Sequence, residues 1–153
     1  MIEKLKRFLK QKNKNFLFVG IGNVLRSDDG VGVYICKNIT ETSNVKTLIV
    51  EVSIENYIKK INDLKPDILV LVDCVNFNKE PGHSDFSPIE HIKDITTNTH
   101  NISLKRVSEF FQMKVMILGI QPASVSIGES LTEDVKESAN RIVENINILN
   151  SSL

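Results

Sequence analysis

The chain has 153 residues, of which 41% are hydrophobic and 25% are charged, values typical of one soluble globular domain. Its 19 basic and 19 acidic residues cancel, so the basic excess of a nucleic-acid-binding protein is missing. No apolar run approaches the roughly 20 residues that span a bilayer, and the N-terminus does not resemble a signal peptide. The chain has only two cysteines. We therefore expect a cytoplasmic protein that contacts no membrane, with a monomer as the default.

Hydrophobic periodicity predicts strands and helices that alternate along nearly the whole chain. The segment at 1–15 is expected to be an amphipathic helical extension. In chain order the other expected elements are a buried strand at 16–21, a helix at 30–42, a strand at 45–50, a helix at 54–64, a buried strand at 68–72, a Pro/Gly-containing loop with an edge strand at 78–88, a helix at 104–111, a strand at 115–118 and a helix at 131–146.

This alternation predicts an α/β domain with a mostly parallel sheet and helices on both faces. In such sheets ligands bind beyond the carboxyl ends of the strands, where the strand order reverses. The polar residues that directly follow the apolar runs are therefore the candidates for function.

Acidic residues and one histidine occupy these positions. Asn23, Asp28 and Asp29 follow the first strand, Asp73 follows the strand at 68–72, and His100 precedes the helix expected at 104–111. We expect two or three carboxylates and one imidazole to converge at one edge of the sheet. Carboxylates with imidazole suit a borderline divalent ion such as nickel or zinc.

Each candidate also has a structural interpretation. Asp29 is equally suited to capping the helix that follows it, and Asp73 to a turn at a strand end. His100 alone is more typical of a solvated or capping histidine. Cys74 is a less favoured candidate, as a nucleophile paired with His100, because a cysteine at a buried strand end is usually a small apolar side chain.

The turn around Gly20 and Gly22 raises a second function, nucleotide binding. A dinucleotide fingerprint would place a third glycine at position 25, which is Leu25, although Glu51 is suitably placed to imitate the ribose-binding acid. The two carboxylates at Asp28 and Asp29 would repel a phosphate at that helix start. A nucleotide-binding oxidoreductase is therefore the weaker interpretation.

Four segments resemble the motifs of the NiFe-hydrogenase maturation endopeptidases. They are Gly20-Ile-Gly-Asn-Val-Leu-Arg-Ser-Asp-Asp-Gly-Val-Gly, Val70-Leu-Val-Asp-Cys-Val-Asn, Thr96-Thr-Asn-Thr-His-Asn-Ile-Ser-Leu and Ile117-Leu-Gly-Ile-Gln-Pro. The last two are most similar to the branch that serves hydrogenases of the formate hydrogenlyase type. The resemblance runs from about residue 16 to about residue 147 and is weakest at 83–94.

The resemblance implies a three-layer α/β/α sandwich around a twisted sheet of about five strands. It further implies an endopeptidase that removes the C-terminal extension of a hydrogenase large-subunit precursor after nickel insertion. The family's metal-binding positions correspond here to Asp29, Asp73 and His100. The nickel would be supplied by the precursor. A nickel- or precursor-binding chaperone of the same fold, without peptidase activity, is the alternative.

Three roles for these residues stay open. The nickel is a recognition element held partly by the precursor's cysteines, or the metal assists hydrolysis by lowering the pKa of a water molecule, or an acid pair acts with Asp28 or Asp73 as general base. Asn23 and Asp28 are candidates for positioning the site. Alternatively, Asn23 holds a left-handed turn and Asp28 makes only a local hydrogen bond. The loop at 78–88 is a candidate for contact with the substrate peptide, with an ordinary surface loop as the alternative.

Overall fold

The structure is a computed structural model of the whole chain, and it describes residues 1–92 and 103–152. Three 3-10 turns, η1 (Ser27–Gly30), η2 (Ile54–Tyr57) and η3 (Ile89–His91), accompany the regular elements. Those elements are α1 (Ile2–Leu9), β1 (Phe16–Ile21), α2 (Val31–Asn38), β2 (Val45–Glu51), α3 (Ile58–Leu64), β3 (Ile68–Cys74), β4 (Ser84–Pro88), α4 (Leu104–Ser108), β5 (Lys114–Ile120) and α5 (Glu133–Ser151).

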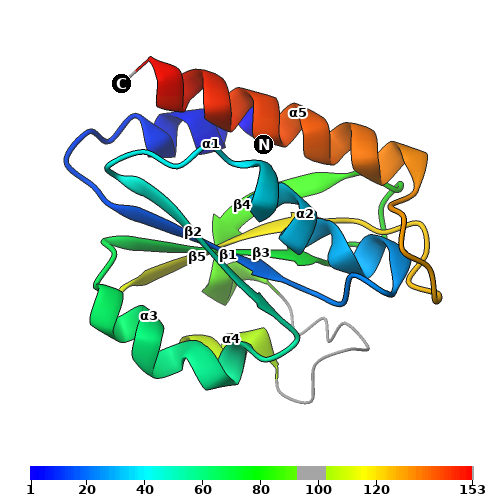
Figure 1. Cartoon of the computed structure of the whole chain (residues 1–153), viewed down its shortest axis with the longest axis horizontal. Coiled ribbons are helices and arrows are strands. Elements are labelled where there is room, and N and C mark those ends of the chain that lie inside the picture. Colours follow the sequence, from blue (N-terminus) through cyan, green and yellow to red (C-terminus); the bar gives the residue numbers. More distant parts are fainter. Residues whose placement is uncertain (93–102, 153) are drawn as a thin grey trace.

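The five strands form one sheet in the order β2-β1-β3-β5-β4 (Figure 1). All neighbouring pairs are parallel except β4 with β5. The expected mostly parallel sheet is therefore confirmed, and the weak edge strand within 78–88 is the antiparallel β4. Because the chain passes from β1 to β2 on one side and to β3 on the other, the strand order reverses between β1 and β3.

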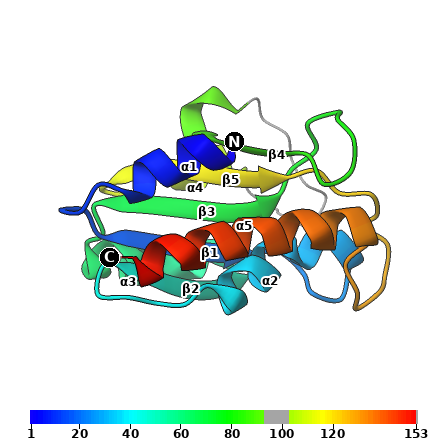
Figure 2. The same ribbon diagram turned by 90° about the horizontal axis from the view of Figure 1, so that it is seen from above.

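Helices cover both faces of this sheet and make three layers (Figures 1 and 2). Helices α1, α2 and α5 lie on one face, and α3 and α4 lie on the other. Each interface has its own apolar core. Alternation along the strands divides the side chains between the two, so that Val70 and Val72 join the first core while Leu69 and Leu71 join the second.

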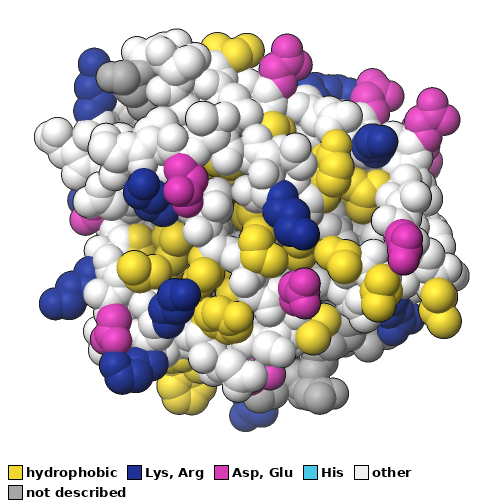
Figure 3. All heavy atoms as spheres, in the orientation of Figure 1, with side chains coloured by type: hydrophobic (Ala, Val, Ile, Leu, Met, Phe, Trp, Pro, Cys, Tyr) yellow, Lys and Arg dark blue, Asp and Glu magenta, His cyan; other side chains and the backbone are white. Residues whose placement is uncertain are grey.

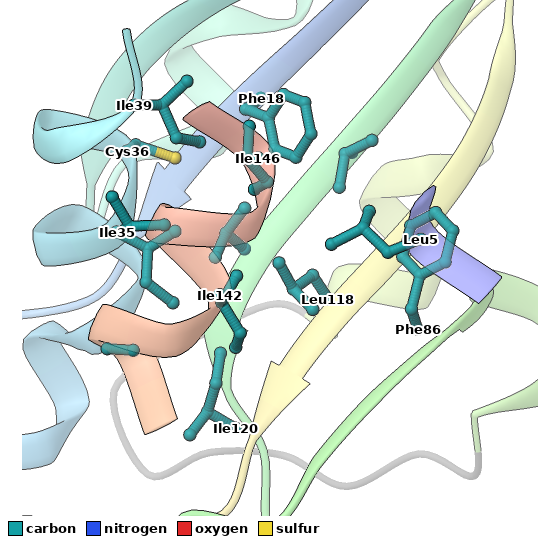
Figure 4. Close-up of a cluster of buried hydrophobic side chains, with 14 of the residues drawn as sticks. Leu5, Phe18, Ile35, Cys36, Ile39, Phe86, Leu118, Ile120, Ile142 and Ile146 are labelled. Atoms are coloured by element: carbon teal, nitrogen blue, oxygen red, sulfur yellow. The ribbon is translucent and has the colours of Figure 1, made fainter. Parts of the chain in front are cut away.

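The N-terminal helix belongs to the main core. Leu5 and Leu9 are buried in the same core as side chains of the sheet and of α5, and Leu5 is labelled in Figure 4. The ring of Phe8 meets that of Phe86 on β4 edge-on, with centroids 5.4 Å apart. Fully burying one such leucine contributes roughly 1.5–3 kcal/mol, so the segment expected as an extension covers part of the sheet.

Helix α2 is shorter than the expected 30–42. It ends at Asn38 because two asparagines of α5 satisfy the backbone beyond that point. The Asn147 amide donates to the Asn38 carbonyl (3.0 Å) and its oxygen accepts from the Thr40 N–H (2.8 Å). The Asn150 amide donates to the Thr40 carbonyl (2.7 Å). These tertiary bonds replace the next helical turn.

Surface charge is mixed, as the zero net charge leads one to expect. On the face drawn in Figure 3, basic and acidic side chains are interspersed with no single-sign cluster. Within residues 1–92 and 103–152, no helix is both long enough and apolar enough to cross a bilayer.

Candidate active site

The candidate site lies where β1 and β3 end, at the reversal of strand order. Helix α2 starts there and sits unusually close to both strands. A Cβ at Gly32 would lie 2.0 Å from the Val72 carbonyl oxygen and 2.5 Å from that of Ile21. Only glycine permits this approach, which brings the residues just before α2 next to the end of β3.

The turn after β1 fixes Asp29 in a buried position. Gly22 has a φ of +126°, and a Cβ there would lie 1.8 Å from the Asp29 carbonyl oxygen. The Asp29 Oδ2 accepts a hydrogen bond from the Asn23 N–H at 2.8 Å, and the residue is 1% exposed. Helix α2 has no side-chain cap, so the capping interpretation of Asp29 was wrong: its carboxylate folds back onto the turn.

Asp73 occupies the matching position on β3. It is the penultimate residue of the strand, pairs with Gly119 of β5 and is 1% exposed. Its Oδ1 accepts a hydrogen bond from the Cys74 N–H at 2.8 Å. The residue therefore belongs to the strand, and the interpretation of Asp73 as a turn residue was wrong.

The 3-10 turn η1, which carries Asp28 and Asp29, packs against β3, which ends with Asp73 and the Cys74 thiol. Burial is the first cause that raises the pKa of this thiol. The negative charges of three carboxylates, Asp73, Asp29 and Asp28, raise it further. Because the thiolate is the nucleophilic form of cysteine, the same environment argues against Cys74 as a nucleophile.

Asp28 is fully buried and faces away from the turn, into the loop between β5 and α5. Its Oδ2 accepts hydrogen bonds from the Ala123 N–H (2.9 Å), the Ser124 N–H (3.0 Å) and the Thr132 hydroxyl (2.8 Å). Its Oδ1 accepts one from the Thr132 N–H at 2.7 Å. These partners lie about a hundred residues along the chain, so the expected local hydrogen bond of Asp28 is instead a long-range clamp on the loop.

Asn23 has the modest role of a turn residue. Its side-chain oxygen accepts from the Leu25 N–H at 2.9 Å, while its own N–H holds Asp29. The left-handed positions of this segment are Gly22 and Ser27, so the expectation that Asn23 adopts that conformation was wrong.

Two residues of the site region carry roles that sequence reasoning missed. Thr132 precedes α5 in the position of a helix cap, but it makes no capping bond and gives its hydroxyl to Asp28. Gln121 accepts at Oε1 from the N–H groups of Phe77 (2.6 Å) and Lys79 (3.3 Å) and so secures the loop after β3. Gln121 could have been found as the polar residue that directly follows an apolar strand. The position of Thr132 before a helix instead predicts a capping bond, which it does not make.

The remaining predictions concern His100, a metal site and the loop at 78–88. His100 lies outside the described residues, and so does Asn101; the residue that precedes α4 is Ser103. Within the described segments no group of three metal-binding side chains is found, so Asp29 and Asp73 do not complete a metal site with other described residues. The segment expected as a peptide-contact loop is in part β4, where Phe86 and Ser87 are buried.

The fold is a five-stranded α/β sandwich with three buried aspartates, Asp28, Asp29 and Asp73, near its switch point, where carboxylates would repel a bound phosphate. Residues 34–148 match the family model described as hydrogenase maturation protease. The chain belongs to the hydrogenase maturation protease family, and it is a peptidase. The family resemblance noted from the motifs is thereby confirmed.

Individual relatives agree with this assignment. A putative hydrogenase maturation protease of Methanocaldococcus jannaschii is 28% identical, with 93% of this chain and 94% of that protein covered. The hydrogenase 3 maturation protease of Escherichia coli K12 is 25% identical over 82% of this chain and 85% of its own. The crystal structure of a NiFe hydrogenase maturation protease, HycI, from Thermococcus kodakarensis superposes with a TM-score of 0.82 at 28% identity, covering 97% of this chain and 99% of that one.

Proposed function

We propose that this peptidase removes the C-terminal extension from the precursor of a NiFe-hydrogenase large subunit after nickel has been inserted. The nickel, carried by the precursor, is the feature that the enzyme recognises. In this proposal Asp29, Asp73 and His100 contact the precursor's nickel, and the precursor's own cysteine thiolates supply its remaining ligands.

The convergence of buried carboxylates at the end of β3 is the observation that carries this proposal. Concentrating negative charge away from water is costly unless a cation or hydrogen-bond donors compensate it. A nickel ion delivered with the substrate is such a cation. Carboxylate and imidazole ligands are hard or borderline donors, and they complement the soft thiolates of the precursor.

The contacts of Asp28 narrow the choice of general base. An ionised carboxylate offers about four lone-pair sites, and Asp28 accepts four hydrogen bonds. Three of these bonds end on Oδ2 and one ends on Oδ1, and together they fix the carboxylate against the loop before α5. In our proposal Asp28 therefore fixes the loop before α5, and the proton-accepting role in hydrolysis belongs to the pair Asp29 and Asp73.

The decisive experiment is mass spectrometry of a nickel-loaded large-subunit precursor incubated with the enzyme. Wild type is compared with Asp29→Asn, Asp73→Asn and His100→Ala, and a nickel-free precursor is the matched substrate control. We expect a C-terminal peptide to be released only by wild type and only from the loaded precursor.

Other outcomes overturn particular parts of the proposal. Equal cleavage of loaded and nickel-free precursor would show that the enzyme does not recognise the nickel. An intact precursor that still forms a complex with wild type would indicate a chaperone. Full activity in Asp29→Asn and Asp73→Asn would place the chemistry elsewhere in the chain.

A further inference from the structure

Two exposed apolar residues occupy neighbouring backbone positions on the loops beside Asp29 and Asp73, which we call the acid pair. Leu25, in the turn after β1, is 56% exposed, and Ile127, in the loop before α5, is 95% exposed. Their backbones meet in a parallel bridge between Arg26 and Gly128, and the Gly128 N–H donates to the Leu25 carbonyl at 2.9 Å. Leu25 and Ile127 therefore occupy neighbouring positions, and we call this pair the edge patch.

The loop that carries Ile127 is held on both sides of that residue. Before it, the Arg26 Nε–H donates to the Val125 carbonyl at 3.1 Å. After it, the Ser27 N–H donates to the Gly128 carbonyl (2.7 Å) and the Ser27 hydroxyl to the Ser130 carbonyl (2.9 Å). With the Asp28 clamp, these bonds fix the backbone beneath an almost fully exposed isoleucine.

A single exposed apolar residue on a surface is ordinary. An adjacent pair on a backbone that many hydrogen bonds hold in place is different, because the free protein gains little apolar burial from it. A contact residue that is already ordered loses less conformational entropy when a partner binds. The arrangement therefore suits binding to a second apolar surface.

We propose that the edge patch is a docking surface for an apolar patch on the folded hydrogenase precursor, next to the segment that carries its extension. This inference rests on the proposed function. Its support is continuity with the site: Leu25 lies in the same turn as Asn23, whose N–H holds Asp29. We expect a folded substrate whose cleavage segment reaches Asp29 and Asp73 to contact the loops that frame them as well.

The test measures KM and kcat for cleavage of the nickel-loaded precursor by the double variant Leu25→Ser/Ile127→Ser. The matched control is Ile148→Ser, because Ile148 is also 56% exposed but lies near the C-terminal end of α5. We expect the double variant to raise KM at least about tenfold with kcat nearly unchanged. The control should have the KM and kcat of wild type.

Binding of the loaded precursor is measured in parallel, so that the two proposals fail separately. If wild type binds but does not cleave, the proposed function fails, and docking is judged by whether the double variant weakens binding. An unchanged KM and unchanged binding in the double variant, or an equal loss in Ile148→Ser, would overturn the docking surface. A wild type that self-associates through this patch, with the double variant monomeric, would assign it to a second copy of this chain instead.

Discussion

The turn after β1 places two consecutive aspartates in two different regions of the molecule. Asp28 lies in the clamp, where its four hydrogen bonds join the turn to the loop before α5. Asp29 lies in the acid pair with Asp73, next to the end of β3. Both residues are at most 1% exposed, so burial alone does not separate structure from function.

The difference is in the kind of partner each carboxylate faces. The clamp joins a carboxylate to four donors of one distant loop, and this arrangement serves folding. The acid pair, Asp29 and Asp73, lies at the strand-order reversal, and in our proposal it serves a cationic ligand and an acid–base reaction. Substitutions in the two regions should therefore separate loss of stability from loss of activity.

The largest expected effect is that of Asp28→Ala. Removing the clamp leaves three backbone N–H groups and one hydroxyl without their acceptor, and we expect the free energy of unfolding to fall by about 3 kcal/mol. Urea denaturation measures this change. The control Asp63→Ala, at an exposed ion pair with Lys59, should stay within about 0.5 kcal/mol of wild type. A similar small change in Asp28→Ala would contradict the clamp.

The acid pair should show the opposite behaviour. We expect Asp29→Asn and Asp73→Asn to lower the rate of precursor cleavage at least about 100-fold, equivalent to about 2.7 kcal/mol of transition-state stabilisation. Their free energies of unfolding should change by about 1 kcal/mol or less, because the amide keeps an oxygen for the backbone N–H. Cleavage assays and urea denaturation on the same samples test this. A variant that loses stability and keeps activity would reverse the assignment of the two regions.

The sequence predicts the position of the acid pair but not the contacts of the clamp. The apolar runs before Asp29 and Asp73 reveal both strands, and the rule for parallel sheets then places both acids at one edge. Nothing local to Asp28 indicates that its partners are Ala123, Ser124 and Thr132, since that contact depends on how the loop before α5 returns to the turn. The same limit explains α2, whose end is set by asparagines of α5.

Cys36 is a buried residue that belongs to neither the clamp nor the acid pair, so it tests the effect of burial by itself. Burial raises the pKa of the Cys36 thiol above the value of about 8.5 for a thiol in an unfolded chain. Below that pH both states keep the proton. Above it only the unfolded state loses the proton, so the free energy of unfolding falls as pH rises, by up to about 1.4 kcal/mol per pH unit for this thiol.

The variant Cys36→Ala removes that contribution. Urea denaturation between pH 7 and pH 10 should show a shallower decline for Cys36→Ala than for wild type, because all other titrating groups are common to both proteins. The lost packing of the sulfur lowers stability at every pH and leaves the slope untouched. Parallel curves for the two proteins would mean that the Cys36 thiol ionises as readily in the folded state as in the unfolded one.

The smallest expected effect comes from removing a single hydrogen bond of the clamp. Thr132→Val keeps the shape of the side chain and the backbone bond to Asp28 Oδ1 but removes the hydroxyl that donates to Oδ2. We expect a loss of about 1 kcal/mol in the free energy of unfolding, because one hydrogen bond to a buried charge disappears and two backbone donors remain on that oxygen. Thr132→Ser keeps the hydroxyl and is the matched control. If the hydroxyl instead capped α5, Thr132→Val would lower the free energy of unfolding equally in wild type and in Asp28→Ala. If it belongs to the clamp, the loss should nearly vanish once Asp28 is already alanine, and this double-mutant cycle separates the two.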